Sequence, residues 1–158
     1  MKNKWLIHLV IMLALTFAGY SSFAQGFSDA AKNEITLALK KFNTAAQNAS
    51  TEQMMKLFDD SENIMFIGSD SAEIWKGKDQ IRGHLNSIFP MESVSLDMNR
   101  VDIDGAGNIA WVFVDGAINI TTEKGDKMKA PYRFSGVLVK KGHEWKWRMF
   151  SGSSPAGK

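Results

Sequence analysis

Asp115 is the acidic residue whose neighbours in the sequence most favour chemistry. It interrupts an apolar run at 110–114, and at strand spacing it shares a face with Trp111 and Phe113. A carboxylate beside aromatic rings and away from water has a raised pKa, which suits a general base or a neutral donor. Alternatively, this face is the outer or dimer-facing side of the sheet and leaves Asp115 partly solvated. Strand alternation alone does not choose between the two faces.

Two further strands predict one wall of a ligand pocket. Arg133 and Ser135 occupy alternate positions of one strand, so their side chains share a face. At the same spacing the next strand carries Trp145, Trp147, Met149 and Ser151. The guanidinium offers a fork of donors to a ligand carboxylate or enolate, and the serines add hydrogen bonds. The alternatives are an ion pair between Arg133 and a surface acid such as Asp115, and an apolar stripe that belongs to the core.

Three more aromatic residues could complete an apolar lining. Phe66 lies in a short apolar segment, Trp75 precedes a predicted helix, and Tyr132 is next to Arg133. Each is also compatible with plain core packing. We place Trp75 near the mouth of the predicted pocket.

Metal and cofactor chemistry has little support in the composition. The chain has no cysteine, and of its three histidines only His84 and His143 follow the N-terminal apolar run. One falls in a predicted helix and the other in a turn, so we expect no histidine metal site and no disulfide. No cofactor motif is present either, and we expect no cofactor.

The first 24 residues have the pattern of a signal peptide. Lys2 and Lys4 precede an apolar run at 5–15, and Ser22-Phe23-Ala24 ends in the small residue that such cleavage sites favour. The run is shorter than the roughly 20 residues that span a bilayer, although an uncleaved anchor is the alternative. We therefore expect a leader at 1–24, a mature domain at 25–158, and a secreted or periplasmic protein that is not membrane-bound after cleavage.

Beyond the leader the chain is formally neutral. Two of its 19 Lys and Arg residues lie in the leader, whereas all 17 Asp and Glu residues follow it. Binding to nucleic acid or to an anionic membrane requires a basic stripe, and the charges here are scattered. Neither partner is expected.

Apolar periodicity predicts three helices followed by long strands. Ser28 and Ser50 are candidate N-caps of the first two helices, and the third lies between Gly77 and Pro90. A short strand at 64–67 separates the second and third helices, and four long strands with tight turns fill the chain after Pro90. This order predicts a single α+β domain in which a curled antiparallel sheet closes over three N-terminal helices.

Several segments in this order resemble the SnoaL-like branch of the nuclear-transport-factor-2-like superfamily. They are Leu57-Phe58, Ile64-Met65-Phe66-Ile67-Gly68, Trp75-Lys76-Gly77-Lys78-Asp79-Gln80-Ile81-Arg82, and a closing hairpin with Arg133, Ser135 and Trp145-Lys146-Trp147. The resemblance implies a cone-shaped fold with a pocket between sheet and helices, and a homodimer through the sheet. Met149 and Ser151 stand where many relatives carry inward histidines.

Two functions fit this pattern. One is an exported module that binds a small, largely apolar ligand in the cone, with Arg133 and the serines holding its polar end. The other, implied by the isomerases, cyclases and hydrolases in the superfamily, is an enzyme that uses Asp115 as acid or base. The two functions differ in one structural requirement: the enzyme needs the Asp115 carboxyl to point into the cavity.

Overall fold

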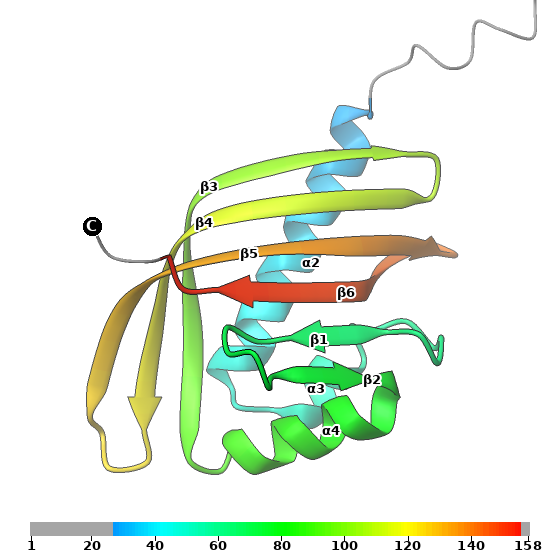
Figure 1. Ribbon diagram of the computed structural model, residues 1–158. Coiled ribbons are helices and arrows are strands. Elements are labelled where there is room, and N and C mark those ends of the chain that lie inside the picture. Colours follow the sequence, from blue (N-terminus) through cyan, green and yellow to red (C-terminus); the bar gives the residue numbers. More distant parts are fainter. Residues whose placement is uncertain (1–26, 156–158) are drawn as a thin grey trace, which may run out of the picture.

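The computed structural model describes residues 27–155, so the leader predicted at 1–24 lies outside the described part. In chain order the elements are α2 (Asp29–Gln47), α3 (Thr51–Met55), β1 (Met65–Ile67), β2 (Ile74–Lys76), α4 (Gly77–Ile88), β3 (Glu92–Ala106), β4 (Ile109–Thr122), β5 (Lys127–Lys141) and β6 (Glu144–Ser153) (Figure 1). Three helices with a curved, open sheet confirm the predicted α+β class. None of the helices between residues 27 and 155 has the length and apolarity needed to cross a bilayer.

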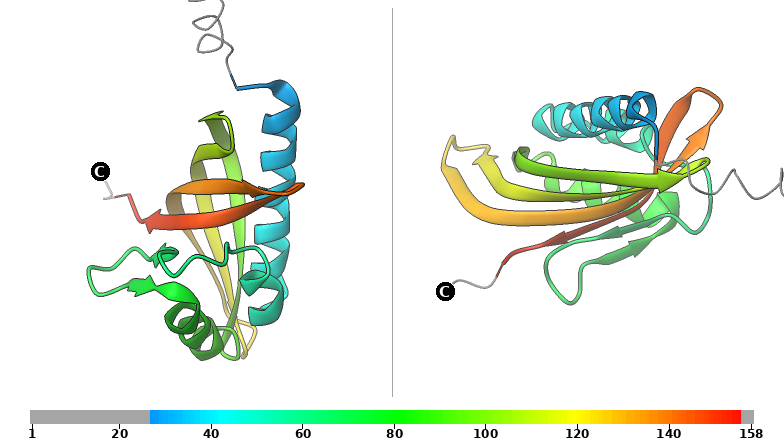
Figure 2. Two further views of the ribbon diagram at one scale, coloured as in Figure 1. Left: turned by 90° about the vertical axis from the view of Figure 1, so that its right-hand side faces the viewer. Right: turned by 90° about the horizontal axis from the view of Figure 1, so that it is seen from above.

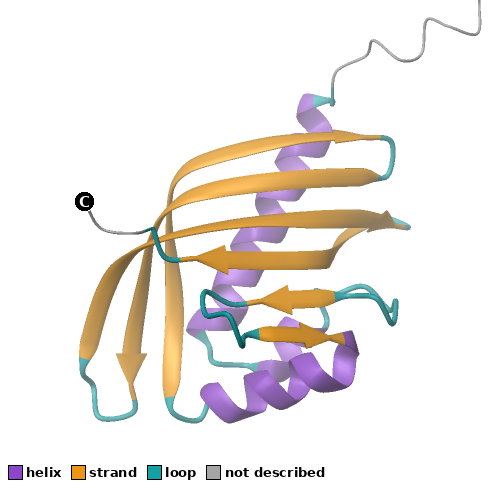
Figure 3. Cartoon of the chain, in the orientation of Figure 1, coloured by secondary structure: helices purple, strands orange, loops and turns teal. Residues whose placement is uncertain are grey.

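The six strands form one sheet in the order β2-β1-β6-β5-β4-β3. The four long strands make the predicted antiparallel meander, joined by tight turns (Figure 3). Two details correct the prediction. The short β2 was not predicted, and it forms a hairpin with β1 in which Phe66 lies opposite Trp75. In addition, β1 runs parallel to β6, so the sheet is mixed rather than wholly antiparallel.

The strands β3, β4 and β5 bend sharply near their middle, which gives the sheet its curl (Figures 1 and 2). The pairing of β3 with β4 shifts register between Met98 and Arg100, as at a β-bulge. Opposite this point lies Gly116, where an added Cβ would sit 1.8 Å from the carbonyl oxygen of Asp97. Only glycine permits so close an approach of the two backbones. The bend turns the ends of β3, β4 and β5 back toward α4.

The helix α2 covers the inner face of the sheet (Figure 2). Its N-cap is Ser28, whose Oγ accepts a hydrogen bond from the Ala31 backbone N–H at 3.2 Å, and Ser50 caps α3 in the same way. Both predicted caps are thereby confirmed. The residues of α2 that face the sheet recur at three- and four-residue steps and are buried: Ile35, Ala38, Leu39, Phe42, Ala45 and Ala46. Their burial is what holds helix and sheet together.

Phe150 is the centre of an aromatic cluster that joins the layers. Its ring stacks on Phe66 from β1 at 4.8 Å between centroids, on Phe42 from α2 at 5.1 Å, and on Phe134 from β5 at 5.2 Å. Trp147 packs edge-on to it at 5.9 Å. Offset aromatic pairs of this kind add about 0.5–1.5 kcal/mol each beyond area burial.

A second bulge determines which side chains of β6 face inward. Val137 pairs with Met149 but Leu138 pairs with Trp147, which leaves Arg148 as the extra residue. Trp147 and Phe150 therefore both point into the core, although they are three positions apart in the sequence. The prediction that Trp147, Met149 and Ser151 share one face is wrong, because the bulge reverses the alternation between them.

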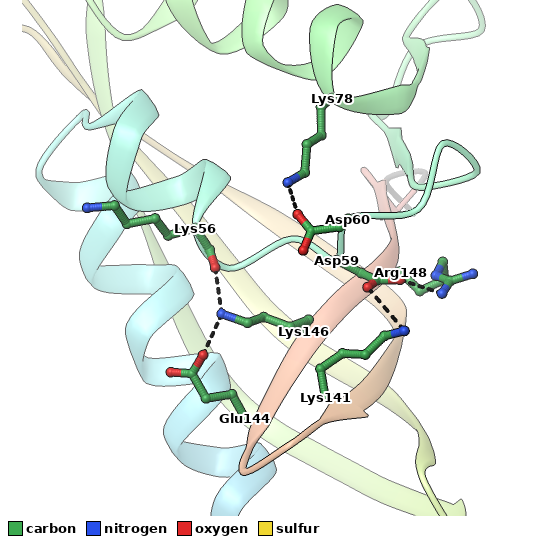
Figure 4. Close-up of polar contacts among 8 residues, drawn as sticks. All are labelled: Lys56, Asp59, Asp60, Lys78, Lys141, Glu144, Lys146 and Arg148. Carbon is green, nitrogen blue, oxygen red and sulfur yellow. Dashed lines mark hydrogen bonds and ion pairs between the residues drawn. The ribbon is translucent and has the colours of Figure 1, made fainter.

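The bulge is anchored by an ion pair between a buried carboxylate and a half-buried guanidinium. Asp59, only 3% exposed, accepts a hydrogen bond from the guanidinium of Arg148 (Figure 4). Its backbone N–H donates to the Trp147 carbonyl at 2.9 Å. Burial alone raises the pKa of the Asp59 carboxyl. The backbone N–H of Asp60 and the Arg148 charge more than offset burial, so the pKa lies below its usual value. The pair fixes the segment after α3 against β6.

We predict that Asp59→Asn destabilises the protein by about 2–4 kcal/mol, because it leaves the Arg148 guanidinium without its counter-charge. Urea unfolding followed by circular dichroism measures the change. The matched control is Asp60→Asn at the adjacent position, where the side chain is 94% exposed and pairs with Lys78 at the surface. We expect this control to lower the free energy of unfolding by less than about 1 kcal/mol. Equal losses in the two variants would contradict the anchoring role.

Candidate functional site

A cavity of about 200 Å³ lies between α2, α4 and the curled end of the sheet. The curl supplies one side of it and the aromatic cluster supplies the floor. Most of its lining is apolar or aromatic: Phe42, Phe66, Trp75, Leu96, Ile118, Ile120, Tyr132 and Phe150. Such a surface, with a few polar groups at one end, is typical of small-molecule sites.

One wall of the cavity is a stack of rings contributed by β1, β2 and α4. The imidazole of His84 lies parallel to the indole of Trp75, with centroids 3.5 Å apart and an interplanar angle of 15°. Phe66 contacts both rings, at 5.6 Å from His84 and 5.9 Å from Trp75. Burial lowers the pKa of His84, against a smaller opposing effect of the Glu73 charge. The imidazole is therefore mainly neutral at neutral pH.

Tyr132 places a protonated phenol in the cavity. Its hydroxyl packs over Gly152 of β6, where an added Cβ would lie 1.7 Å from the oxygen. The absence of a side chain at Gly152 is thus what gives the phenol room. Burial, and to a smaller extent the charge of Glu73, raises the pKa of Tyr132 from 10.0 to about 12. The hydroxyl is consequently a hydrogen-bond donor at physiological pH.

Two carboxylates supply the charged groups of the lining. Glu73 comes from the loop between β1 and β2, and Glu92 begins β3. The backbone N–H of Asp70 donates to Glu73 Oε2 at 3.0 Å, which holds the side chain against Gly68. An added Cβ at Gly68 would lie 2.0 Å from that oxygen, so the glycine is required for this placement.

The structure divides the residues predicted to form the site between the two faces of the sheet. Phe66, Trp75 and Tyr132 line the cavity as predicted. Trp147 points to the same side but is fully buried in the core beneath it. The other predicted residues lie on the outer face of the sheet: Asp115, Arg133, Ser135, Met149 and Ser151.

The alternative reading of Asp115 as an outer-face residue is confirmed. Its carboxylate accepts a hydrogen bond from Arg133 Nε at 2.5 Å, and the two side chains are 42% and 49% exposed. Ala110, Val112 and Val114 take the inward positions of β4, so Asp115 faces outward. Acid or base chemistry by Asp115 inside the cavity is therefore excluded, and Arg133 does not reach a ligand there.

The polar residues of the cavity were largely missed from the sequence. His84 lies three residues after Ile81 and one before Leu85, both buried, so helical periodicity could have placed it on the inner face of α4. Glu73 lies in a loop between two three-residue strands, and no periodicity marks it. No residues between 27 and 155 form a cluster of three or more acidic, histidine or cysteine side chains that could hold a metal ion.

A second hollow, of about 340 Å³, lies on the outer face beside Trp111, Phe113, Ser135 and Met149. It is poorly enclosed, because Trp111 is 49% exposed and Phe113 38% exposed. A small ligand there would stay largely in water. This surface suits contact with another protein face better than enclosure of a small molecule.

The comparisons with known protein families and with solved structures agree with each other. The sequence profile described as "SnoaL-like domain" matches residues 35–157. The sequence matches no curated protein. Many solved structures share the fold of this chain. The sequence identity is low in each of the three described next.

Three of these structures illustrate the likeness. A protein of the NTF2-like family from Streptomyces avermitilis is 14% identical with a TM-score of 0.73, covering 82% of this chain and 100% of that one. An NTF2-like superfamily protein from Salmonella enterica is 21% identical with a TM-score of 0.70, covering 80% and 92%. A ketosteroid isomerase-like protein from Erwinia carotovora is 17% identical with a TM-score of 0.64, covering 79% and 96%. At such identities the likeness shows the fold alone.

We predict that Tyr132 ionises near pH 12 in the folded protein. A chain beginning at Gln25 carries no other tyrosine, so the ultraviolet absorbance of tyrosinate reports it alone. Because the folded pKa is raised, the associated stability is intact below pH 10 and is lost as the pH rises toward 12. Glu73→Gln lowers the midpoint, since it removes a nearby negative charge, whereas Glu62→Gln leaves it unchanged. A native midpoint near 10 would show that the phenol is exposed.

Proposed function

The chain belongs to the SnoaL-like family, and on this basis we propose that it binds a small, largely apolar molecule in the cavity between its helices and its sheet. The observation that carries the proposal is the composition of the lining. Aromatic and aliphatic side chains surround the space, while Tyr132, His84 and Glu73 offer a donor, a neutral imidazole and a carboxylate. Such sites use apolar area for affinity and a few polar groups for orientation.

The volume limits the size of the ligand. An apolar cavity of about 150 Å³ in another protein binds benzene. At about 200 Å³ the present cavity holds a single ring with a short substituent. A larger ligand would have to extend beyond the cavity.

Proton transfer in the same cavity is a second candidate function. Glu73 and the neutral His84 are possible bases, and the protonated phenol of Tyr132 could donate to a developing oxyanion. The observation that favours it is the presence of all three groups on one lining. Recovery of a bound compound chemically unchanged supports binding, whereas its conversion supports catalysis.

We predict that benzyl alcohol, a neutral probe of suitable size, binds in the cavity with a dissociation constant of about 1 mM. Nuclear magnetic resonance follows the indole N–H signal of Trp75 during the titration. Val94→Trp fills the cavity from β3 and abolishes the shift. The control Val101→Trp introduces the same side chain on the same strand, outside the lining, and leaves the shift intact. Equal binding by both variants would contradict the proposed site.

The proposal includes a homodimer formed through the outer face of the sheet. Ile109, Trp111 and Phe113 leave 51%, 49% and 38% of their surface exposed there. Figure 2 shows no helix over this side of β3, β4 and β5 in residues 27–155. Exposed aromatic side chains grouped on one face are typical of protein interfaces.

We also propose that the protein is exported and works in the secreted or periplasmic compartment. The support is the N-terminal pattern of two lysines, a short apolar run and Ser22-Phe23-Ala24. A chain without cysteine folds independently of the redox state of that compartment.

Native mass spectrometry after expression in a bacterium tests export and assembly together. We predict twice the mass of the chain from Gln25 to Lys158. Trp111→Lys gives half that mass, because it places a charge in the interface. Met91→Lys is the control, because Met91 is 56% exposed at the turn before β3 and lies outside the proposed interface. We expect this variant to remain a dimer. A monomer that retains residues 1–24 would contradict both proposals.

A further inference from the structure

We infer that the cavity selects a small organic cation, an amine that carries an apolar group, over neutral and anionic molecules of the same size. The inference rests on the proposed function and specifies the ligand class for that site. Three independent features of the lining carry it: its charges, the pairing of its carboxylates, and its aromatic faces.

The charged residues of the lining are all acidic. Glu73 and Glu92 contribute carboxylates, and none of the lining residues within the described chain is Lys or Arg. His84 is mainly neutral, and Tyr132 keeps its proton. An anion in this cavity would face two negative charges without a cationic partner, whereas a cation would have two counter-charges.

Among the buried and half-buried acids of the described chain, only the two carboxylates of the cavity lack an ion-pair partner. Five acidic residues between 27 and 155 are buried or half-buried: Asp59, Glu73, Glu92, Asp97 and Asp115. The three outside the cavity each pair with a cation of the chain, namely Arg148, Lys129 and Arg133. Glu73 and Glu92 pair with none of the described Lys or Arg residues. A half-buried carboxylate without a protein cation is available to a cation from outside.

Hydrogen bonding at Glu73 supports this availability. Oε2 accepts the backbone N–H of Asp70, which fixes the carboxylate in place. Oε1 accepts no hydrogen bond from the described residues. An ammonium N–H group is a donor that fits this oxygen, whereas a ligand carboxylate is not.

Aromatic faces provide the third feature. Phe66, Trp75 and Tyr132 line the same cavity as the two carboxylates. Their rings carry negative potential on their faces and attract a cation within about 6 Å, most strongly when the cation is shielded from water. The remaining apolar lining fits the hydrocarbon part of the amine. Aromatic faces grouped around a site are a recognised arrangement for binding ammonium ligands.

The test compares three probes that share one ring and differ in charge: benzylammonium, benzyl alcohol and benzoate. Each is titrated at pH 7 into the uniformly labelled chain, with the Trp75 indole N–H signal as the readout. We expect benzylammonium to bind at least about tenfold more tightly than benzyl alcohol, a difference of roughly 1.4 kcal/mol. Benzoate should bind more weakly than benzyl alcohol.

Isosteric variants identify the source of the preference. Glu73→Gln and Glu92→Gln each reduce the ratio of benzylammonium to benzyl alcohol affinity by at least about threefold, and the double variant abolishes it. Glu62→Gln, at an exposed acid outside the lining, leaves the ratio unchanged. Because the ratio is taken within each variant, a general loss of stability does not imitate the effect.

The outcomes separate the inference from the proposed function. Equal binding of benzyl alcohol and benzylammonium, or tighter binding of benzoate, overturns the cation preference and leaves the cavity as a ligand site. A preference that survives the double variant overturns the role of the two carboxylates. Binding of none of the three probes overturns the proposed function, and the inference with it.

Discussion

The stacking of Phe150 against Phe42, Phe66 and Phe134 is the interaction on which the rest of the fold depends. It brings α2, β1, β5 and β6 to one point, and three of the four rings also form the floor of the cavity. Phe150 can occupy this position only because the bulge at Arg148 turns it inward after Trp147. The buried Asp59 in turn holds Arg148. One irregular residue in an otherwise regular hairpin therefore determines both the core and the site.

The cavity also depends on the curl of the sheet, and this curl arises from a second local irregularity of the strands. The bulge in β3 and the close backbone approach at Gly116 bend the long strands, so that Ile118, Ile120 and Tyr132 come to face α4. Gly68 and Gly152 make room for Glu73 and Tyr132. The charges then divide in a consistent way. Buried or half-buried acids elsewhere on the described chain are neutralised by neighbouring cations, whereas those of the cavity are not.

The regular elements could be predicted from the sequence because periodicity and capping are local signals. Ser28 and Ser50 marked helix starts correctly, and the four long strands followed from alternation and turn residues. The site could be predicted only in part. Phe66, Trp75 and Tyr132 were correctly placed, but the face of Asp115 depends on which side of the sheet meets α2, and that is a tertiary fact.

The errors have equally specific causes. Met149 and Ser151 were assigned to the face of Trp147 because strict alternation does not foresee a bulge. Glu73 reaches the cavity through a loop whose path is set by the pairing of two three-residue strands, and no local pattern encodes that pairing. Resemblance to a family supplied the fold but not the charges of the pocket, which belong to this chain.

We propose that the ligand site is the space between the curled sheet and the helices. Intermolecular nuclear Overhauser effects from a bound benzylammonium ring to the methyl groups of the labelled chain test it most directly. We predict contacts to Ile118 and Ile120, which line the cavity, and none to Ile109 or Met149 on the outer face. Contacts to Ile109 and Met149 instead would place the ligand on the exposed side of the sheet and would exclude the inner cavity as its site.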